Sequence, residues 1–278
     1  MIEHVYDTRM VAPAQGYSPS AAKPAAVVAA WKKAFPDIVS IPPDAATRED
    51  FERAHDPDYV RDVLAGALPN GFGTINPELT VTLPFTSGAM LTAARRAMAT
   101  RRPVAAPCSG FHHAGWAQGG GLCTFNGLMV AALALQADQP GLRVGVLDYD
   151  YHYGDGTDDI IRRLQSCDVT HISAGLSWTR RAQAAAFLDH IAEDLQQMKL
   201  CDVVLYQAGA DPHVDDPLGG FLTTSEMTLR DRYVFEGLAA RRIPVAWNLA
   251  GGYQHPLANV VELHVNTMRV CIASSLVG

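Results

Sequence analysis

Short apolar runs alternate with helical patterns along the whole chain. Seven runs of mostly apolar or β-branched residues predict strands over 2–7, 37–41, 103–107, 143–148, 169–173, 202–209 and 244–251. Ala-rich stretches or apolar positions at helical spacing predict helices over 21–35, 87–101, 125–137, 182–199 and 223–242. The last of these begins with Thr and Ser capping candidates, has Glu226 near its third position and closes before Pro244.

Several of the predicted strands are apolar throughout rather than alternating. Such strands are buried on both faces, which is typical of a mostly parallel sheet that lies between layers of helices. No internal repeat, low-complexity tract or linker interrupts the chain, and the turn clusters at 66–73 and 214–221 indicate loops within one domain. We therefore predict a single doubly wound α/β domain over residues 1–278, with helices on both faces of its central sheet.

Composition limits the classes of function. The 278 residues are 48% hydrophobic and 18% charged, which suits a large core, and a net charge of −7 gives no basic surface for nucleic acid. The five cysteines form no CxxC pair, the start of the chain shows no secretory signal pattern, and no apolar stretch approaches the ~18 residues of a membrane span. These features predict a cytoplasmic protein with reduced thiols and no membrane partner. The oligomeric state, including a homodimer, stays open.

Polar and glycine-rich groups follow four of the predicted strands, at 109–115, 148–156, 208–220 and 250–254. Because ligands of open α/β sheets bind beyond the carboxyl ends of the strands, we expect these groups to meet at one site. The glycine run at 119–123 lacks both phosphate-binding patterns and indicates close backbone approach along a narrow pocket.

Asp150 and His152 lie two residues apart just after an apolar strand. In extended backbone such residues point the same way, and with Asp211 they make a set of two carboxylates and one imidazole. Three protein ligands with an open position are typical of a catalytic metal site, and this donor set admits zinc, iron(II), cobalt or manganese. The alternative is that Asp148, Asp150 or Asp155 caps a helix that starts near Gly156.

The adjacent pair His112 and His113 follows another predicted strand and is flanked by glycines. Imidazole is the usual proton-transfer group near neutral pH, and Asp148 and Asp155 are available to orient the two rings. Tyr253, after two glycines, could donate a hydrogen bond to a developing oxyanion. The remaining histidines are predicted to be structural: His4, His55, His171, His190, His213, His255 and His264, with His213 the least secure because it lies two residues past Asp211.

Taken together, these blocks resemble the metal-dependent histone deacetylase and acetylpolyamine amidohydrolase superfamily. The matching stretches are SGFHHAG, GGGLCTFN, VLDYDYHYGDGT, YQAGADPHVDDPLGG and LAGGYQ, in the family's order over roughly residues 104–254, with HDPDYV (55–60) as a further match. The residues of the DDPLGG and GGYQ stretches are closer to those of bacterial and class II or class IV members than to those of class I. The resemblance implies an arginase-like α/β fold.

The resemblance also implies a role for each matched residue. Asp150, His152 and Asp211 would bind one catalytic Zn²⁺; His112 and His113, oriented by Asp148 and Asp155, would be the acid/base pair; and Tyr253 would polarise the acyl carbonyl. A structural K⁺ would lie beneath the zinc, with Asp148, Asp150, His152 and Ser173 contributing to it.

The chain departs from the family pattern in three places. Tyr153 stands where class I members have a second histidine, and Leu122 replaces the aromatic residue after the pocket glycine. The stretch between His171 and Asp211 is short and lacks the family's aromatic loop on the opposite wall of the substrate channel, a place that Trp178 is a candidate to fill.

These residues predict hydrolysis of an N-acyl amine, such as an acyl-lysine, an acetylated polyamine or another small acetylated amine. One alternative is a ureohydrolase with two Mn²⁺ ions, although the sequence contains no DxDxxDP-like block. The other is a protein that binds an acylated ligand without turning it over.

Overall fold

A computed structural model describes residues 2–14, 16, 18–165 and 167–275. Its centre is a sheet of seven parallel strands in the order β2-β1-β3-β7-β6-β4-β5. Each predicted apolar run contains one strand: β1 Glu3–Val5, β2 Val39–Ile41, β3 Val104–Ala106, β4 Val144–Asp148, β5 Val169–Ser173, β6 Val203–Gly209 and β7 Val245–Ala250. The prediction of a parallel α/β sheet is confirmed.

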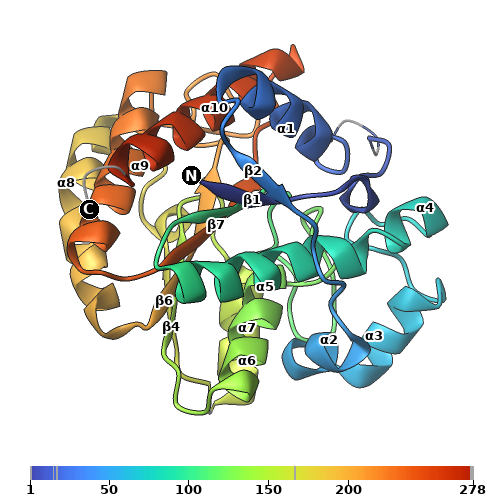
Figure 1. Cartoon of the computed structure of the whole chain (residues 1–278). Coiled ribbons are helices and arrows are strands. Elements are labelled where there is room, and N and C mark those ends of the chain that lie inside the picture. The colour runs from blue at the N-terminus through green and yellow to red at the C-terminus, as the bar shows by residue number, and fades with distance from the viewer. Residues whose placement is uncertain (1, 15, 17, 166, 276–278) are drawn as a thin grey trace.

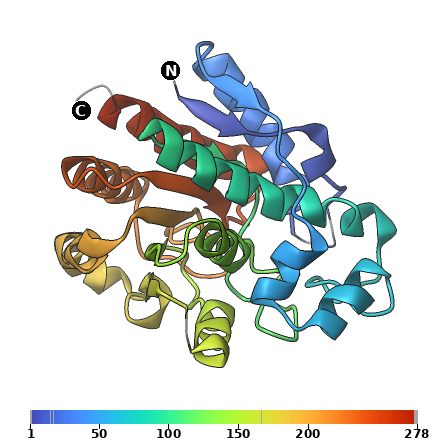
Figure 2. The ribbon, with the colours of Figure 1, turned by 60° about the horizontal axis from the view of Figure 1, so that its bottom comes forward.

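Helices cover both faces of this sheet (Figures 1 and 2). Along β6, Val204 and Tyr206 pack into the core beneath α1, α8, α9 and α10, whereas Val203 and Leu205 pack into the core beneath α5 and α6. This alternation explains why the central strands are apolar throughout. The helices are α1 Lys23–Ala34, α2 Arg48–Ala54, α3 Pro57–Leu64, α4 Pro77–Thr80, α5 Leu83–Thr100, α6 Gly127–Asp138, α7 Asp155–Leu164, α8 Ala184–Gln197, α9 Thr224–Ala240 and α10 Leu257–Ser274.

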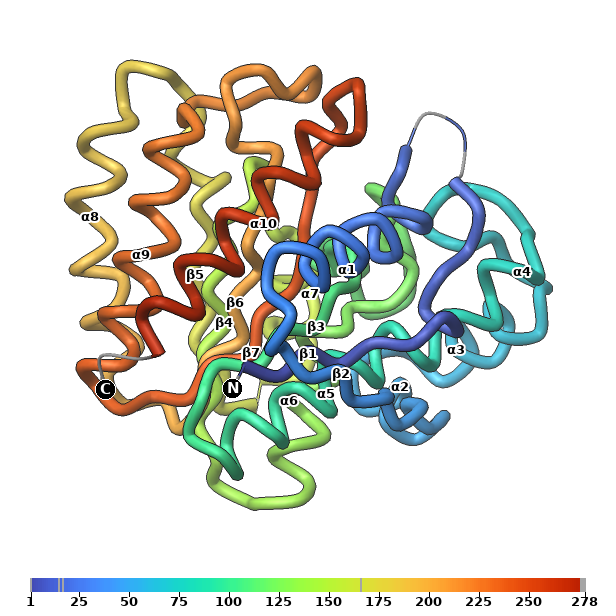
Figure 3. Tube along the Cα trace, turned by 45° about the horizontal axis from the view of Figure 1, so that its top comes forward, coloured from blue at the N-terminus to red at the C-terminus, as the bar shows by residue number. Residues whose placement is uncertain are grey.

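The five predicted helices are present as α1, α5, α6, α8 and α9. Helix α9 begins as the sequence predicts, because Thr223 and Glu226 form a capping box at its first turn. Figure 3 shows α8, α9 and α10 side by side over one face of the sheet. Among the described residues, none of the helices is long and apolar enough to cross a membrane.

The short helices α2, α3 and α4 form a separate layer beside the sheet (Figure 3). Their core contains Phe51 and Tyr59, whose rings both contact Phe125. Helix α3 begins where Asp56 caps the first turn ahead of Pro57, a common start because proline needs no hydrogen-bond acceptor there. This layer supports the segment that follows the glycine run 119–123.

Strand pairing brings the carboxyl ends of the central strands to one edge. Asp148 at the end of β4 is level with Gln207 in β6, and the last residues of β6 and β7, Gly209 and Ala250, are paired. Ala106, at the end of β3, lies level with Asn248 of β7. The four polar groups that follow these strands therefore start from the same edge of the sheet.

Candidate active site

Asp150, His152 and Asp211 converge just beyond the ends of β4 and β6. One ligand atom from each lies within 4.8 Å of the other two. His152 Nδ1 is 2.9 Å from Asp211 Oδ2 and 3.3 Å from Asp150 Oδ1. The structure thus brings together the three residues predicted as metal ligands.

Electrostatics at this point favour a bound cation. Both carboxylates are buried, and burial together with the charge of Asp150 raises the pKa of Asp211 to about 7. Hydrogen bonds to Asp150 and Asp211 raise the pKa of His152 to about 10. Two buried carboxylates beside one imidazole are costly without a compensating positive charge, so the donor set fits a divalent metal ion.

His112 lies against both the metal-ligand group and Asp148. Its Nδ1 is 2.7 Å from Asp148 Oδ2, and its Nε2 is 3.7 Å from Asp150 Oδ1. Burial disfavours the imidazolium, but the two carboxylates outweigh it and raise the pKa of His112 to about 9. The contacts with Asp148 and Asp150 therefore favour the protonated form of His112.

His113 has the opposite character. Burial and the charge of the neighbouring His112 lower its pKa, although Nδ1 is 2.7 Å from Asp155 Oδ1. The rings of His112 and His113 are 4.1 Å apart between centroids. A neutral imidazole beside a charged one can accept a proton, which distinguishes the two histidines chemically.

The structure also bears on the helix-cap alternative. Gly154 is the N-cap of α7, and it makes no side-chain capping hydrogen bond. The Asp155 carboxylate, in the first turn of that helix, bonds instead with His113. Asp148 lies in β4 and bonds with His112, so neither carboxylate is accounted for by capping alone.

A narrow cavity of about 20 Å³ opens over this group, large enough for a water molecule. Its walls include Tyr253 and Gly251, and a Cβ on Gly251 would lie 2.2 Å from Asp211 Cγ. The predicted close approach at the glycine run is also present, because a Cβ on Gly121 would lie 2.4 Å from His113 Cδ2. The lining residues are Ser20, Ser109, Gly110, His112, His113, Gly121, Leu122, Cys123, Asp150, His152, Gly251 and Tyr253.

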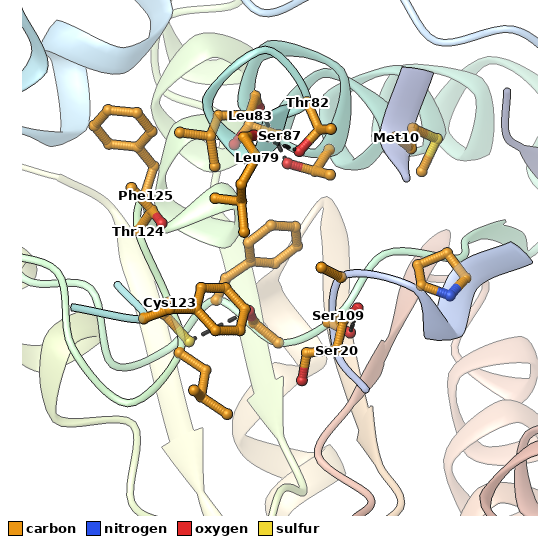
Figure 4. A pocket seen from close by; sticks show the side chains of 17 residues that line it. Met10, Ser20, Leu79, Thr82, Leu83, Ser87, Ser109, Cys123, Thr124 and Phe125 are labelled. Carbon is orange, nitrogen blue, oxygen red and sulfur yellow. Dashed lines mark hydrogen bonds between the residues drawn. The ribbon is translucent and has the colours of Figure 1, made fainter. Parts of the chain in front are cut away.

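Figure 4 shows a second, mostly apolar cavity of about 70 Å³. The two share Ser20, Ser109, Gly110, Leu122 and Cys123 as lining residues. The far walls come from the N-terminal segment, α4 and the first turns of α5, with Leu79, Leu83 and Ser87 turned towards the space (Figure 4). The space is suited to an apolar group that extends from the site.

The structure adds three polar residues to the site that were not predicted from the sequence. Gln207, fully buried in β6, donates to Asp148 Oδ1 at 2.9 Å and accepts from the backbone N–H of Phe111 at 3.1 Å. The amine of buried Lys23 donates to the carbonyl of Gly251, and Asp216 accepts from the Tyr253 N–H at 2.7 Å. A glutamine inside an apolar strand is unusual, so the sequence could have indicated Gln207 as a site residue. No sequence pattern distinguishes Lys23, which begins an Ala-rich helix.

His171, predicted to be purely structural, lies next to the site. Its Nδ1 is 2.7 Å from Asp158 Oδ1, and its Nε2 is 3.9 Å from Asp148 Oδ2. Tyr153, at the position of the class I histidine, donates to the same Asp158. Asp148 therefore lies between two histidines, His112 and His171. By contrast, His213 bonds with Thr224 and lies outside the metal-ligand group.

Two of the departures from the family pattern can be located. Leu122 lines the cavity over the metal-ligand group, with a positive φ of 69°. Trp178 packs against Phe187 and His190 of α8, and it is not among the residues that line that cavity.

Comparison with known proteins agrees with this geometry. Residues 20–174 match the family model for the histone deacetylase domain. An uncharacterized protein of Picosynechococcus is 28% identical over 80% of this chain and 81% of its own. Acetylpolyamine amidohydrolase 1 of Pseudomonas aeruginosa is 31% identical over 58% of this chain. The matched region spans about half (51%) of the length of that relative. The crystal structure of the HDA15 HD domain has the same fold, with a TM-score of 0.80 at 21% identity over 99% of this chain and 92% of that one.

The fold and site define a parallel α/β protein in which two carboxylates and one imidazole form a group that could hold a metal ion. With more than half of its length matched by the family model, the chain belongs to the histone deacetylase domain family. Membership supports hydrolysis of the deacetylase type.

Proposed function

We propose that the protein hydrolyses N-acyl amines with one catalytic Zn²⁺, acting on an acyl-lysine or on a small acetylated amine. The observation that carries this proposal is the gathering of a metal-ligand group and two carboxylate-paired histidines at one cavity. A relative named as an acetylpolyamine amidohydrolase supports the acetylated-amine class of substrate.

Asp150, His152 and Asp211 would hold the zinc ion, which when bound supplies Lewis-acid stabilisation of negative charge on the acyl oxygen. His113, kept neutral, takes a proton from the attacking water and later delivers it to the leaving amine. His112 stays charged and favours the developing oxyanion electrostatically.

Tyr253 completes the proposed set by donating its phenol hydrogen to the same oxyanion. Burial and the nearby Asp211 raise the pKa of this phenol, so it stays protonated and able to donate. We also propose a structural K⁺ held by Asp148, Asp150, His152 and Ser173; in support, Ser173 Oγ lies 3.4 Å from Asp148 Oδ2.

The test is a panel of fluorogenic acyl-lysines and acetylated polyamines, assayed before and after chelation and after Zn²⁺ is added back. We expect activity on at least one member, loss with the chelator and recovery with zinc. Asp211→Asn should abolish both activity and recovery. Undiminished turnover in metal-free protein would contradict the proposal.

The two alternatives are separated by counting metals and products. Among the described residues, Asp150, His152 and Asp211 are the only group of three or more His, Cys, Asp or Glu side chains close enough together to hold a metal ion, which supports one catalytic ion rather than two Mn²⁺ ions. Tight binding of acetyl-lysine without acetate release would instead indicate a binding protein.

A further inference from the structure

Behind the metal-ligand group lies a fully buried arginine, Arg230, which points from α9 towards the ends of β4 and β6. Its Nη1 donates to two backbone carbonyls, that of Tyr149 at 3.1 Å and that of Gly209 at 2.8 Å. Tyr149 directly precedes Asp150, and Gly209 lies two residues before Asp211. One guanidinium thus bridges the two backbone segments that deliver the carboxylate ligands.

Beyond the end of β4, the two hydrogen bonds of Arg230 link segments that no longer pair as strands. Strand β4 ends at Asp148, and the last backbone hydrogen bond between these segments runs from the Tyr149 N–H to the Gln207 carbonyl at 3.1 Å. Past this point the segments are very close, because a Cβ on Gly209 would lie 2.6 Å from Asp150 Cα. The Tyr149 carbonyl shares its peptide plane with the Asp150 N–H, so fixing the carbonyl also fixes the direction in which Asp150 leaves the chain.

A network around Asp231 holds the guanidinium in place. Arg230 Nε donates to Asp231 Oδ1 at 2.8 Å, and that carboxylate also accepts from Tyr206 and Thr267, both at 2.6 Å. Within the described part of the chain, Arg230 Nη2 has no hydrogen-bond partner. Burying an arginine with an unpaired nitrogen costs stability, so packing alone does not explain the residue.

We propose that Arg230 is a positioning residue that sets the spacing of Asp150 and Asp211 and thereby the affinity of the site for its metal ion. This inference rests on the proposed function, because it assumes that these carboxylates bind a metal. Lysine cannot replace the arginine, since one ammonium lacks the planar fork that Asp231 and the two carbonyls occupy together.

The experiment measures the Zn²⁺ affinity of metal-free protein by competition with a chromophoric chelator, and the absorption spectrum of the Co²⁺ form. The variants are Arg230→Lys, Arg230→Met and the control Arg232→Met, which removes an exposed arginine from the same helix, α9. We expect both Arg230 variants to bind Zn²⁺ at least about 10-fold more weakly and to show altered Co²⁺ spectra, as typically follows the loss of a group that orients metal ligands. The control should bind as wild type does.

Urea unfolding of the metal-free proteins separates this effect from loss of the fold. If the Arg230 variants do not fold, Asp231→Asn tests the same bridge by releasing the guanidinium, and it should also weaken Zn²⁺ binding. Wild-type affinity and spectrum in a folded Arg230→Lys or Asp231→Asn variant would overturn the inference. Failure of the wild type itself to bind Zn²⁺ or Co²⁺ would instead overturn the proposed function.

Discussion

His112 and His113 show how neighbouring residues of one type acquire different chemistry. His112 faces two buried carboxylates, whereas His113 faces one exposed carboxylate and the charge of His112. The sequence suggested a pair of proton-transfer groups, but it did not indicate which of the two is neutral. That difference depends on distances set by separate strands.

His113→Ala should remove the proton-transfer group and leave the metal ligands intact. We expect turnover to fall by about 10²–10⁴-fold, the usual contribution of a general acid/base, with zinc content unchanged. Steady-state rates and metal analysis of the purified variant check this. The control is His190→Ala, which alters a histidine on α8. A variant that keeps most of its activity would show that His113 has another role.

At the scale of elements, the strands were the most predictable part. Their apolar runs reflect burial on both faces of the sheet. The polar groups that follow the strands indicated the edge of the sheet at which the candidate site lies. Helix α10 was not predicted, although Val260, Leu263, Met268 and Cys271 follow a helical period, because its β-branched residues obscure the pattern. The burial of single charged residues in helices, such as Lys23 and Arg230, depends on tertiary contacts that no local pattern shows.

Strand β6 contributes more than Asp211, because Gln207 links it to Asp148 and to the loop that carries His112. Gln207→Leu would leave the Phe111 N–H without its partner. We expect a loss of about 1–3 kcal/mol in the free energy of unfolding, together with lower kcat. Urea unfolding and rate measurements check this against Leu205→Met, a change of similar volume on the same face. Wild-type stability and kcat would contradict the expectation.

The apolar cavity beside the site predicts a preference in acyl chain length. Ser87 of α5 lines the apolar cavity and not the cavity over the metal-ligand group. Ser87→Leu should therefore fill the apolar cavity, and Ser87→Ala is the matched control that leaves it open. We expect Ser87→Leu to lower kcat/KM for hexanoyl-lysine about 10-fold, the usual effect of losing an apolar contact in a substrate pocket, while acetyl-lysine hydrolysis changes little. Equal effects on the two substrates, or no wild-type activity on hexanoyl-lysine, would contradict this use of the cavity.

For the whole molecule, histidines of two kinds make stability depend on pH. At the site, carboxylates raise the pKa values of His112 and His152. Elsewhere, burial lowers the pKa values of His4 and His55 from 6.5 to about 4. The first kind stabilises the metal-free fold fully below pH 6.5 and less as pH rises. The second kind acts in the opposite direction, because its stabilising contribution is present above pH 6.5 and is lost as pH falls towards 4.

Between pH 6.5 and 4 the buried neutral histidines therefore lower the free energy of unfolding as the pH falls. His55 is fixed as neutral, since its Nδ1 bonds with the Gly115 carbonyl at 2.8 Å and its Nε2 accepts from the Asn126 N–H at 2.9 Å. Lowering the pH from about 7.5 to about 4.5 should cost about 2–3 kcal/mol of unfolding free energy through His55 alone. His55→Gln should be less stable at pH 7.5 and should lose correspondingly less on acidification. Urea unfolding of the metal-free proteins at both pH values measures this, and equal losses in wild type and variant would show that His55 does not titrate in this window.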